Sequence, residues 1–374
     1  TVTVNMLWSA QFMTFMPQTI EVLSGSCVTI PCSFGIEDKY KSKVDETCKA
    51  LWKYDVETVV FDSRNPQTRG HLTGNLRNRD CTTTLNNMRP ENSKNYFFRL
   101  ACEGLLYNFF QTQLHISVKD VPPTPTLTPS TLKVEEGTSV SLKCSAPAPC
   151  LSHPPALTWS SSQGHIQESL QENLDRTKVQ TSVLTFTASH LHHGKEISCT
   201  AVYNKQEGST QSVSTSLTAD ISYPPKNTTV SVSPSGPVPE NSRVTLTCSS
   251  TANPAVSSYT WYRADGGRET VMGTGHVSKI KASRDSGPFF CEAENAIGSG
   301  RSNISQIDVH CKYHKWSLVS DMNCHLDLSP FVHRLLSEQQ HHCESTTTEG
   351  SFHFALQQLQ LPGINYSEIF CLQP

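Results

Sequence analysis

The reactive side chains that stand out in this sequence are its cysteines. The chain has 14 of them in 374 residues, and no two form the Cys-X-X-Cys pair that is typical of zinc ligands. So many thiols without such spacing predict disulfides and an oxidising compartment. Three N-glycosylation sequons, at Asn227, Asn303 and Asn365, indicate the same compartment. We therefore expect an extracellular protein.

Histidine could support catalysis, and the chain has 15 histidines. However, His190, His192 and His193 fall where a turn is expected, and the sequence lacks Gly-X-Ser-X-Gly, His-Glu-X-X-His and glycine-rich phosphate-binding motifs. We expect no enzyme and no bound cofactor. A formal net charge of -3 also argues against nucleic-acid binding, which needs a basic face.

The cysteines belong to three repeats of one unit. Each repeat opens with apolar residues at every second position, ending in Cys, as in a strand with one buried face. A Trp follows 13 to 20 residues later, and two repeats then have a second strand with Cys. This order on short strands indicates an all-β immunoglobulin sandwich. The residues are Cys32 and Trp52; Cys144, Trp159 and Cys199; and Cys248, Trp261 and Cys291.

Proline pairs separate the repeats, because proline removes a backbone donor and interrupts strand pairing. They follow Val121 and Tyr223. We expect a lead-in with the start of the first strand over 1–17, and domains over 18–119, 120–221 and 222–310.

Residues 311–374 do not continue the pattern. His341, His342 and Cys343 raise the alternative of a metal site, but their spacing matches no zinc pattern. We expect an irregular tail with no domain and no metal. The chain has no apolar run that would span a membrane and no intact signal peptide, so we interpret it as a processed or incomplete form of a secreted or cell-surface protein.

The first domain departs from the usual disulfide. The second Cys of an immunoglobulin domain follows the corner tyrosine by two residues, and here Phe98 occupies that place after Tyr96. Cys81 shares the parity of Leu85 on a predicted neighbour of the Cys32 strand. A Cys32–Cys81 bridge within one sheet follows.

Strand parity also pairs the remaining cysteines. Cys27 faces away from Cys32, so it needs a partner outside this core, and Cys150 in the second domain is spare. Cys48 and Cys102 fall on adjacent predicted strands and could bridge at the end of the sheet. The ordinary bridges are expected to be Cys144–Cys199 and Cys248–Cys291.

The same parity turns Arg99 outward. On an exposed strand an isolated Arg is usually a solvated charge, but apolar neighbours surround this one, and aromatic residues follow on the next predicted strand. A guanidinium beside an aromatic ring suits a sugar carboxylate, because its planar fork can donate two hydrogen bonds. The aromatic residues are Tyr107, Phe109 and Phe110.

The cysteine pair within one sheet, the extra Cys directed to the second domain and the segment Tyr96-Phe-Phe-Arg99 resemble the siglecs, the sialic-acid-binding immunoglobulin-like lectins. The resemblance covers about 12–310. It implies one V-set domain followed by two C2- or I-type domains. It also implies that Arg99 pairs with the sialic acid carboxylate and that Phe12 packs on the glycerol chain. Tyr107, Phe110 and Gln111 would contact the rest of the sugar.

We therefore expect an adhesion or recognition ectodomain that binds sialylated glycoproteins or glycolipids. The family implies a location at the plasma membrane for the full-length form, while the chain as it stands would be secreted. The alternative is an immunoglobulin-superfamily adhesion or immune receptor that binds a protein without sialic acid. An acidic side chain paired with Arg99 would favour that alternative.

Overall fold

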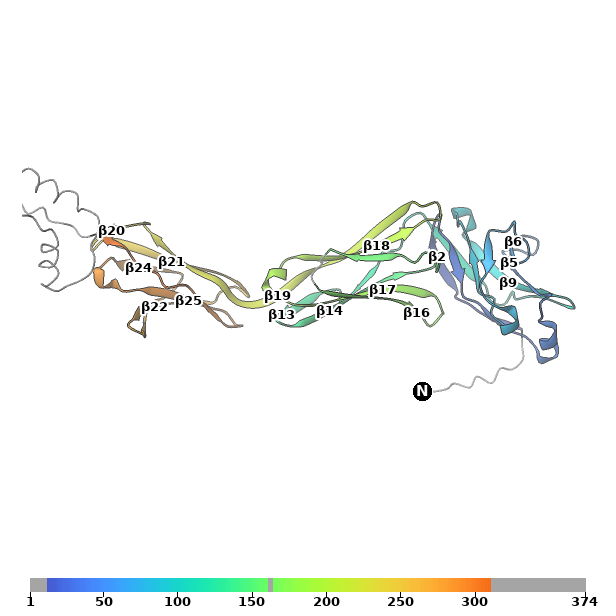
Figure 1. Cartoon of the computed structure of the whole chain (residues 1–374), viewed down its shortest axis with the longest axis horizontal. Coiled ribbons are helices and arrows are strands. Elements are labelled where there is room, and N and C mark those ends of the chain that lie inside the picture. Colours follow the sequence, from blue (N-terminus) through green and yellow to red (C-terminus); the bar gives the residue numbers. More distant parts are fainter. Residues whose placement is uncertain (1–11, 161–163, 311–374) are drawn as a thin grey trace, which may run out of the picture. The chain divides into compact units, whose positions relative to one another are not determined.

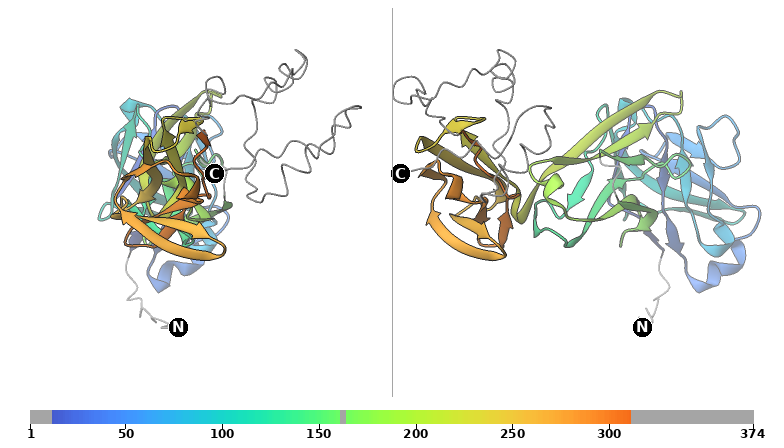
Figure 2. Two further views of the ribbon diagram at one scale, coloured as in Figure 1. Left: turned by 90° about the vertical axis from the view of Figure 1, so that its left-hand side faces the viewer. Right: turned by 60° about the vertical axis from the view of Figure 1, so that its left-hand side comes forward.

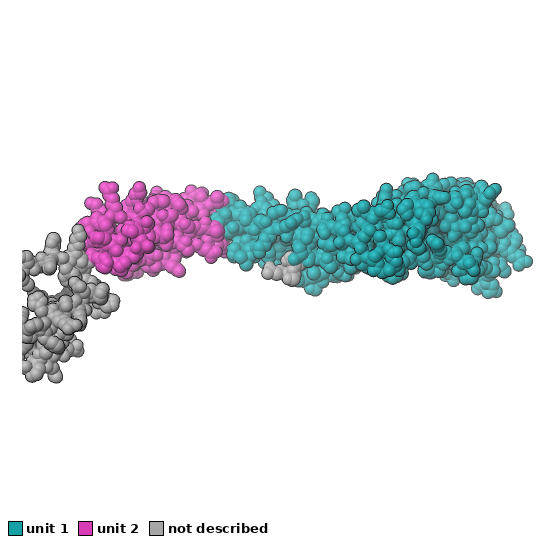
Figure 3. Space-filling model, turned by 90° about the horizontal axis from the view of Figure 1, so that it is seen from above, with its two compact units in different colours: residues 1–224, 252–254 teal, residues 225–251, 255–374 magenta. Residues whose placement is uncertain are grey.

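The computed structural model describes residues 12–160 and 164–310, which are mostly β-strand (Figure 1). The chain divides into two compact units, residues 1–224 with 252–254 and residues 225–251 with 255–374 (Figure 3). The first unit contains the first two domains. The predicted all-β fold of tandem immunoglobulin-like sandwiches is confirmed. The expected tail, its candidate metal residues and Asn365 lie outside the described residues.

The first domain is a sandwich of two sheets. The larger sheet has the strand order β2-β11-β9-β5-β6, with β10 paired to β9, and the smaller has the order β3-β8-β7. The larger sheet consists of β2 (Thr19–Leu23), β5 (Lys49–Lys53), β6 (Val59–Asp62), β9 (Lys94–Cys102), β10 (Leu105–Asn108) and β11 (Leu114–Lys119). The smaller sheet consists of β3 (Val28–Ile30), β7 (Gly70–Leu72) and β8 (Thr83–Leu85). A separate pair is formed by β1 (Met13–Phe15) and β4 (Ser33–Gly35), and the 3-10 helices are η1 (Asp38–Lys43), η2 (Leu76–Asn78) and η3 (Pro90–Asn92).

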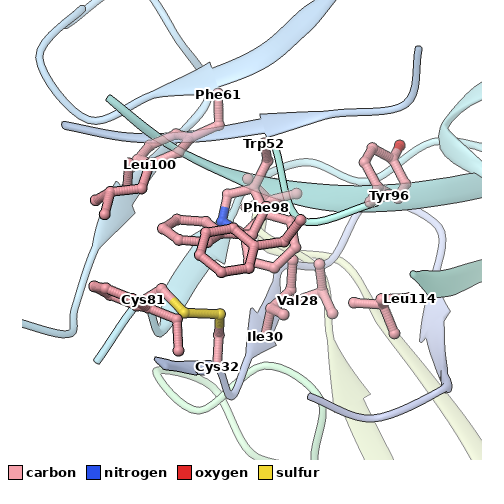
Figure 4. Packing of buried hydrophobic residues seen from close by; sticks show 14 of the residues in the cluster. Val28, Ile30, Cys32, Trp52, Phe61, Cys81, Tyr96, Phe98, Leu100 and Leu114 are labelled. Carbon is pink, nitrogen blue, oxygen red and sulfur yellow. A yellow bond between two sulfur atoms is a disulfide. The ribbon is translucent and has the colours of Figure 1, made fainter. Parts of the chain in front are cut away.

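The core of the first domain is built around aromatic rings rather than a bridge between the sheets. Phe98 is fully buried, with its ring centre 5.8 Å from that of Trp52 and 5.5 Å from that of Phe34 (Figure 4). The Cys32–Cys81 disulfide joins the segment just after β3 to the segment just before β8, and these two strands are neighbours in the smaller sheet. Packing between the sheets therefore replaces the covalent link between them.

The alternation along β9 decides which side chains reach solvent. Tyr96, Phe98 and Leu100 point into the core, and Arg99 points out and is half-buried. Phe97 also points out, yet it is 3% exposed because the ring of Phe110 covers it at a centroid distance of 4.5 Å. The outer face of β9 thus has its own apolar contact.

The second domain is joined covalently to the first through the Cys27–Cys150 disulfide. Beside the disulfide, the Thr29 amide donates to the Pro149 carbonyl at 2.7 Å. Leu23 at the end of β2 packs into an apolar cluster that otherwise belongs to the second domain. Together these contacts make the two domains one compact unit.

The second domain has a sheet of order β12-β14-β17-β16 and a second sheet in which β15, β18 and the first part of β19 pair in that order, with β13 on β19. Its Cys144–Cys199 disulfide has a Cα–Cα distance of 6.4 Å. The strands are β12 (Thr126–Thr128), β13 (Leu132–Glu135), β14 (Ser139–Pro147), β15 (Ala156–Trp159), β16 (His165–Glu172), β17 (Lys178–Thr187), β18 (Glu196–Asn204) and β19 (Thr210–Ser233), and η4 is His190–His192.

The third domain has two layers of strands (Figure 2). Trp261 and the Cys248–Cys291 disulfide are buried in its core. The last part of β19 pairs with β21 and β21 with β24, while the other layer has the order β23-β22-β25-β26. Its elements are β20 (Val238–Pro239), β21 (Arg243–Asn253), β22 (Ser258–Asp265), β23 (Arg268–Thr274), β24 (Val277–Lys281), β25 (Phe289–Glu294), β26 (Ser299–Arg301), β27 (Val309–His310) and η5 (Arg284–Ser286). Within 12–160 and 164–310, no helix has the length and apolar character to cross a bilayer.

Phe98→Ala should lower the free energy of unfolding of the first domain by about 3–5 kcal/mol, because it leaves a cavity beside Trp52. Leu106→Ala, on β10, is the matched control: its side chain is 65% exposed, so its effect should stay within about 0.5 kcal/mol. Urea denaturation measures the free energy of unfolding of each variant, and hydrogen exchange of the β9 amides shows whether the change lies in the first domain. Equal losses in the two variants would contradict the proposed core.

Tyr96 gives a second prediction, because burial, helped slightly by Tyr54, raises the pKa of its phenol from 10.0 to about 12. The hydroxyl donates to the Asn92 carbonyl at 2.8 Å, so Tyr96→Phe should cost about 1 kcal/mol at neutral pH. Since the folded-state pKa is raised, this contribution is complete below pH 10.0 and is lost as pH rises through 12. Unfolding free energies measured across this range should converge for wild type and variant, and parallel curves would argue against the buried phenol.

Candidate binding site on the outer face of β9

The strand register places Arg99 in the middle of the outer face of the larger sheet. Arg99 pairs with Leu51 on β5 and with Asn108 on β10. Cross-strand partners point to the same side of a sheet, so these three side chains share the face that turns away from the core. The β9–β10 hairpin that fixes this register turns at Glu103 and Gly104, where Gly104 has a φ of +71°.

Arg99 makes one hydrogen bond within the described part of the chain: its Nη1 donates to Asn108 Oδ1 at 2.8 Å. No carboxylate among residues 12–160 and 164–310 forms an ion pair with it. Two lysines on the same face are held differently, Lys49 by Asp62 at 2.9 Å and Lys53 by the Val56 carbonyl. The guanidinium therefore presents a positive charge that is not neutralised by any acidic side chain in the described part of the chain.

An aromatic side chain lies on the same face. Phe110 packs on Phe97, two residues before Arg99 on β9, and it remains 46% exposed. Gln111 follows it at the surface. An uncompensated guanidinium beside an exposed ring can bind an anion that carries an apolar surface.

Two of the expected contact residues lie on the other side of the hairpin. Tyr107 pairs with Leu100, whose side chain is in the core, and the Phe12 ring stacks on Tyr107 at 4.0 Å and 21°. Phe12 also lies 5.6 Å from Tyr40. The structure thus brings Phe110 to the face of Arg99 but places Phe12 and Tyr107 together against the core side of β10.

Asn108 is the site residue that sequence reasoning missed. Its partnership with Arg99 depends on where the hairpin turns, and a turn shifted by one residue would place a different side chain there. Gly104 could have predicted this partnership from the sequence. A two-residue turn that ends at Gly104 fixes the register between β9 and β10.

The Cys48–Cys102 disulfide links β9 to β5 at the end of the strands near Arg99. It joins the start of β5 to the last residue of β9, with a Cα–Cα distance of 3.9 Å, three residues beyond Arg99. Within the described residues the structure has five disulfides: Cys27–Cys150, Cys32–Cys81, Cys48–Cys102, Cys144–Cys199 and Cys248–Cys291. Within the described ranges, no three His, Cys, Asp or Glu side chains gather as a metal site would require.

The described sequons lie outside the first domain. Asn227 and Asn303 are exposed and both belong to the third domain, and the first domain contains no sequon. Their exposure is compatible with glycan attachment.

Comparison with known proteins identifies the immunoglobulin domains. A CD80-like C2-set immunoglobulin model matches residues 123–210, and an immunoglobulin domain model matches residues 224–295. Among solved structures, the full ectodomain of mouse nectin-like molecule 4 is 21% identical, with a TM-score of 0.42 over 79% of this chain and 98% of that one.

Curated relatives match over a larger share of the chain. Myelin-associated glycoprotein of Mus musculus is 30% identical over 308 residues, which cover 78% of this chain and 47% of the relative. Sialic acid-binding Ig-like lectin 12 of Homo sapiens is 25% identical over 319 residues, which cover 78% of this chain and 51% of the relative. By sequence, the chain is similar to the siglecs. It spans about half the length of the curated relatives it matches.

Non-reducing peptide mapping should recover Cys48 linked to Cys102 and Cys32 linked to Cys81. Each pair has a Cα–Cα distance below 5 Å, 3.9 Å and 4.8 Å respectively, which is short enough for a disulfide. Reduced and alkylated protein is the control, in which each peptide appears singly. A peptide that links Cys32 to Cys102 would contradict the arrangement of β9.

Proposed function

We propose that the first domain binds sialylated glycans on the outer face of β9. The guanidinium of Arg99 donates hydrogen bonds to the sialic acid carboxylate, and Phe110 and Gln111 contact the rest of the sugar. The partners are sialylated glycoproteins or glycolipids. Recognition takes place without chemistry, as in an adhesion receptor.

The observation that carries this proposal is the state of Arg99. Its one hydrogen bond in the described residues goes to a neutral amide, so its charge and its remaining N–H donors are available to a ligand. A carboxylate held by such a fork contributes roughly 1.5–3 kcal/mol. The named lectin relatives, which bind sialic acid, support the choice of carboxylate.

The arrangement of the aromatic residues refines the expected contacts. Phe110 is the ring on the face of Arg99, so we assign it the apolar side of the sugar. Phe12 and Tyr107 stack on the core side of β10, and their role is to support the hairpin that carries Asn108. A single shallow site of this kind binds weakly after the cost of association, so adhesion depends on many copies engaging many glycans.

The same proposal places the protein outside the cell. Five disulfides and the exposed Asn227 and Asn303 suit an oxidising, glycosylating compartment. We place the protein at the plasma membrane, with its immunoglobulin domains outside the cell.

Arg99→Ala should abolish adhesion of the ectodomain to sialylated cells, because it removes the group that meets the carboxylate. Arg99→Lys should lose most of the binding, since an ammonium cannot donate two parallel bonds. Both variants should melt within a few degrees of wild type, because the side chain points away from the core. Arg77→Ala, which removes an exposed arginine that pairs with Glu46, is the matched control and should bind normally.

Sialidase treatment of the cells separates this proposal from the protein-receptor alternative. Wild-type binding should fall to the level of Arg99→Ala once sialic acid is removed. If Arg99→Ala still binds and sialidase makes no difference, the lectin proposal is wrong and a protein ligand takes its place.

A further inference from the structure

We infer that Asn108 is a positioning residue for Arg99 and that its neutrality keeps the site open to an anionic ligand. The inference rests on the proposed function. It assigns a specific role to a side chain on β10 that makes no contribution to the core.

The direction of the Asn108 amide follows from the chemistry of arginine. A guanidinium has N–H donors and no acceptor, so the atom 2.8 Å from Nη1 must be the amide oxygen. The amide nitrogen then points away from Arg99, and its two N–H groups have no acceptor in the described part of the chain. Oriented in this way, Asn108 holds one edge of the guanidinium and offers donors beside it.

Asparagine suits this position better than either a carboxylate or an apolar side chain. A carboxylate would form an internal ion pair with Arg99 and would compete with the carboxylate of the ligand. An apolar side chain would leave the guanidinium free to rotate, and the ligand would then bear the entropy of ordering it. The Asn108 amide orients the Arg99 guanidinium by a hydrogen bond and does not neutralise its positive charge.

The other charged side chains described on this face have partners of their own, so they do not position Arg99 in place of Asn108. Asp62, an acidic side chain on this face, is held by Lys49 at 2.9 Å. Lys53 is turned to the Val56 carbonyl. The charge that a ligand meets at Arg99 therefore depends on the residue at 108.

Asn95 provides a matched control on the same strand face as Arg99. It lies at the other end of β9 and is exposed, with its Oδ1 2.8 Å from the Nδ1 of His115. Asn95→Asp adds the same charge as Asn108→Asp to the same sheet, but away from the guanidinium.

The test measures binding of the ectodomain and its variants to immobilised multivalent sialyllactose, with multivalent lactose as the blank. Asn108→Asp should lower the affinity roughly tenfold or more, and Asn108→Ala by a few-fold. Asn95→Asp should bind like wild type. The affinity of wild type should fall as salt rises, and Asn108→Asp should lose much of that dependence, which a merely structural change would leave in place.

The outcomes distinguish the two proposals. If wild type binds sialyllactose and Asn108→Asp binds equally well with the same salt dependence, Asn108 has no such role, while the proposed function stands. Equal losses in Asn108→Asp and Asn95→Asp would show a non-specific charge effect and would also overturn the inference. If wild type does not distinguish sialyllactose from lactose, the proposed function itself is wrong.

Discussion

The buried ring of Phe98 occupies the place where immunoglobulin domains usually have the cysteine that bridges their sheets. The two sheets of the first domain are therefore held together by packing of Phe98 on Trp52 and Phe34, and the Cys32–Cys81 disulfide is confined to one sheet. The position of β9 in the sandwich depends on this ring. Because the Phe98 side chain points into the core, the next side chain on the strand, Arg99, must point outward.

The candidate site follows from that constraint in two steps. The alternation of β9 turns Arg99 to the outer face, and the hairpin to β10 brings Asn108 against it. The Cys48–Cys102 disulfide then ties the hairpin end of β9 to β5. The site is thus a consequence of strand register on a rigid sheet, which suits recognition of a small charged group without rearrangement.

The sequence predicts the features that depend on parity within one strand. Tyr96, Phe98 and Arg99 could be assigned to their faces because strand alternation has a period of two. The roles of Phe12 and Tyr107 could not be predicted, because their face depends on the register between β9 and β10 and on the path of the chain before β1. Register between strands is set by the turn and the packing together, and neither is read from spacing alone.

The central claim is that a carboxylate ligand binds directly at the guanidinium of Arg99. Its most direct test is an NMR titration that follows the side-chain Nε–Hε resonances of the arginines as sialyllactose is added to the ectodomain. The account predicts a saturable shift of the Arg99 resonance, together with shifts at Phe110, and no shift with lactose. An unchanged Arg99 resonance with shifts elsewhere in the domain would contradict it.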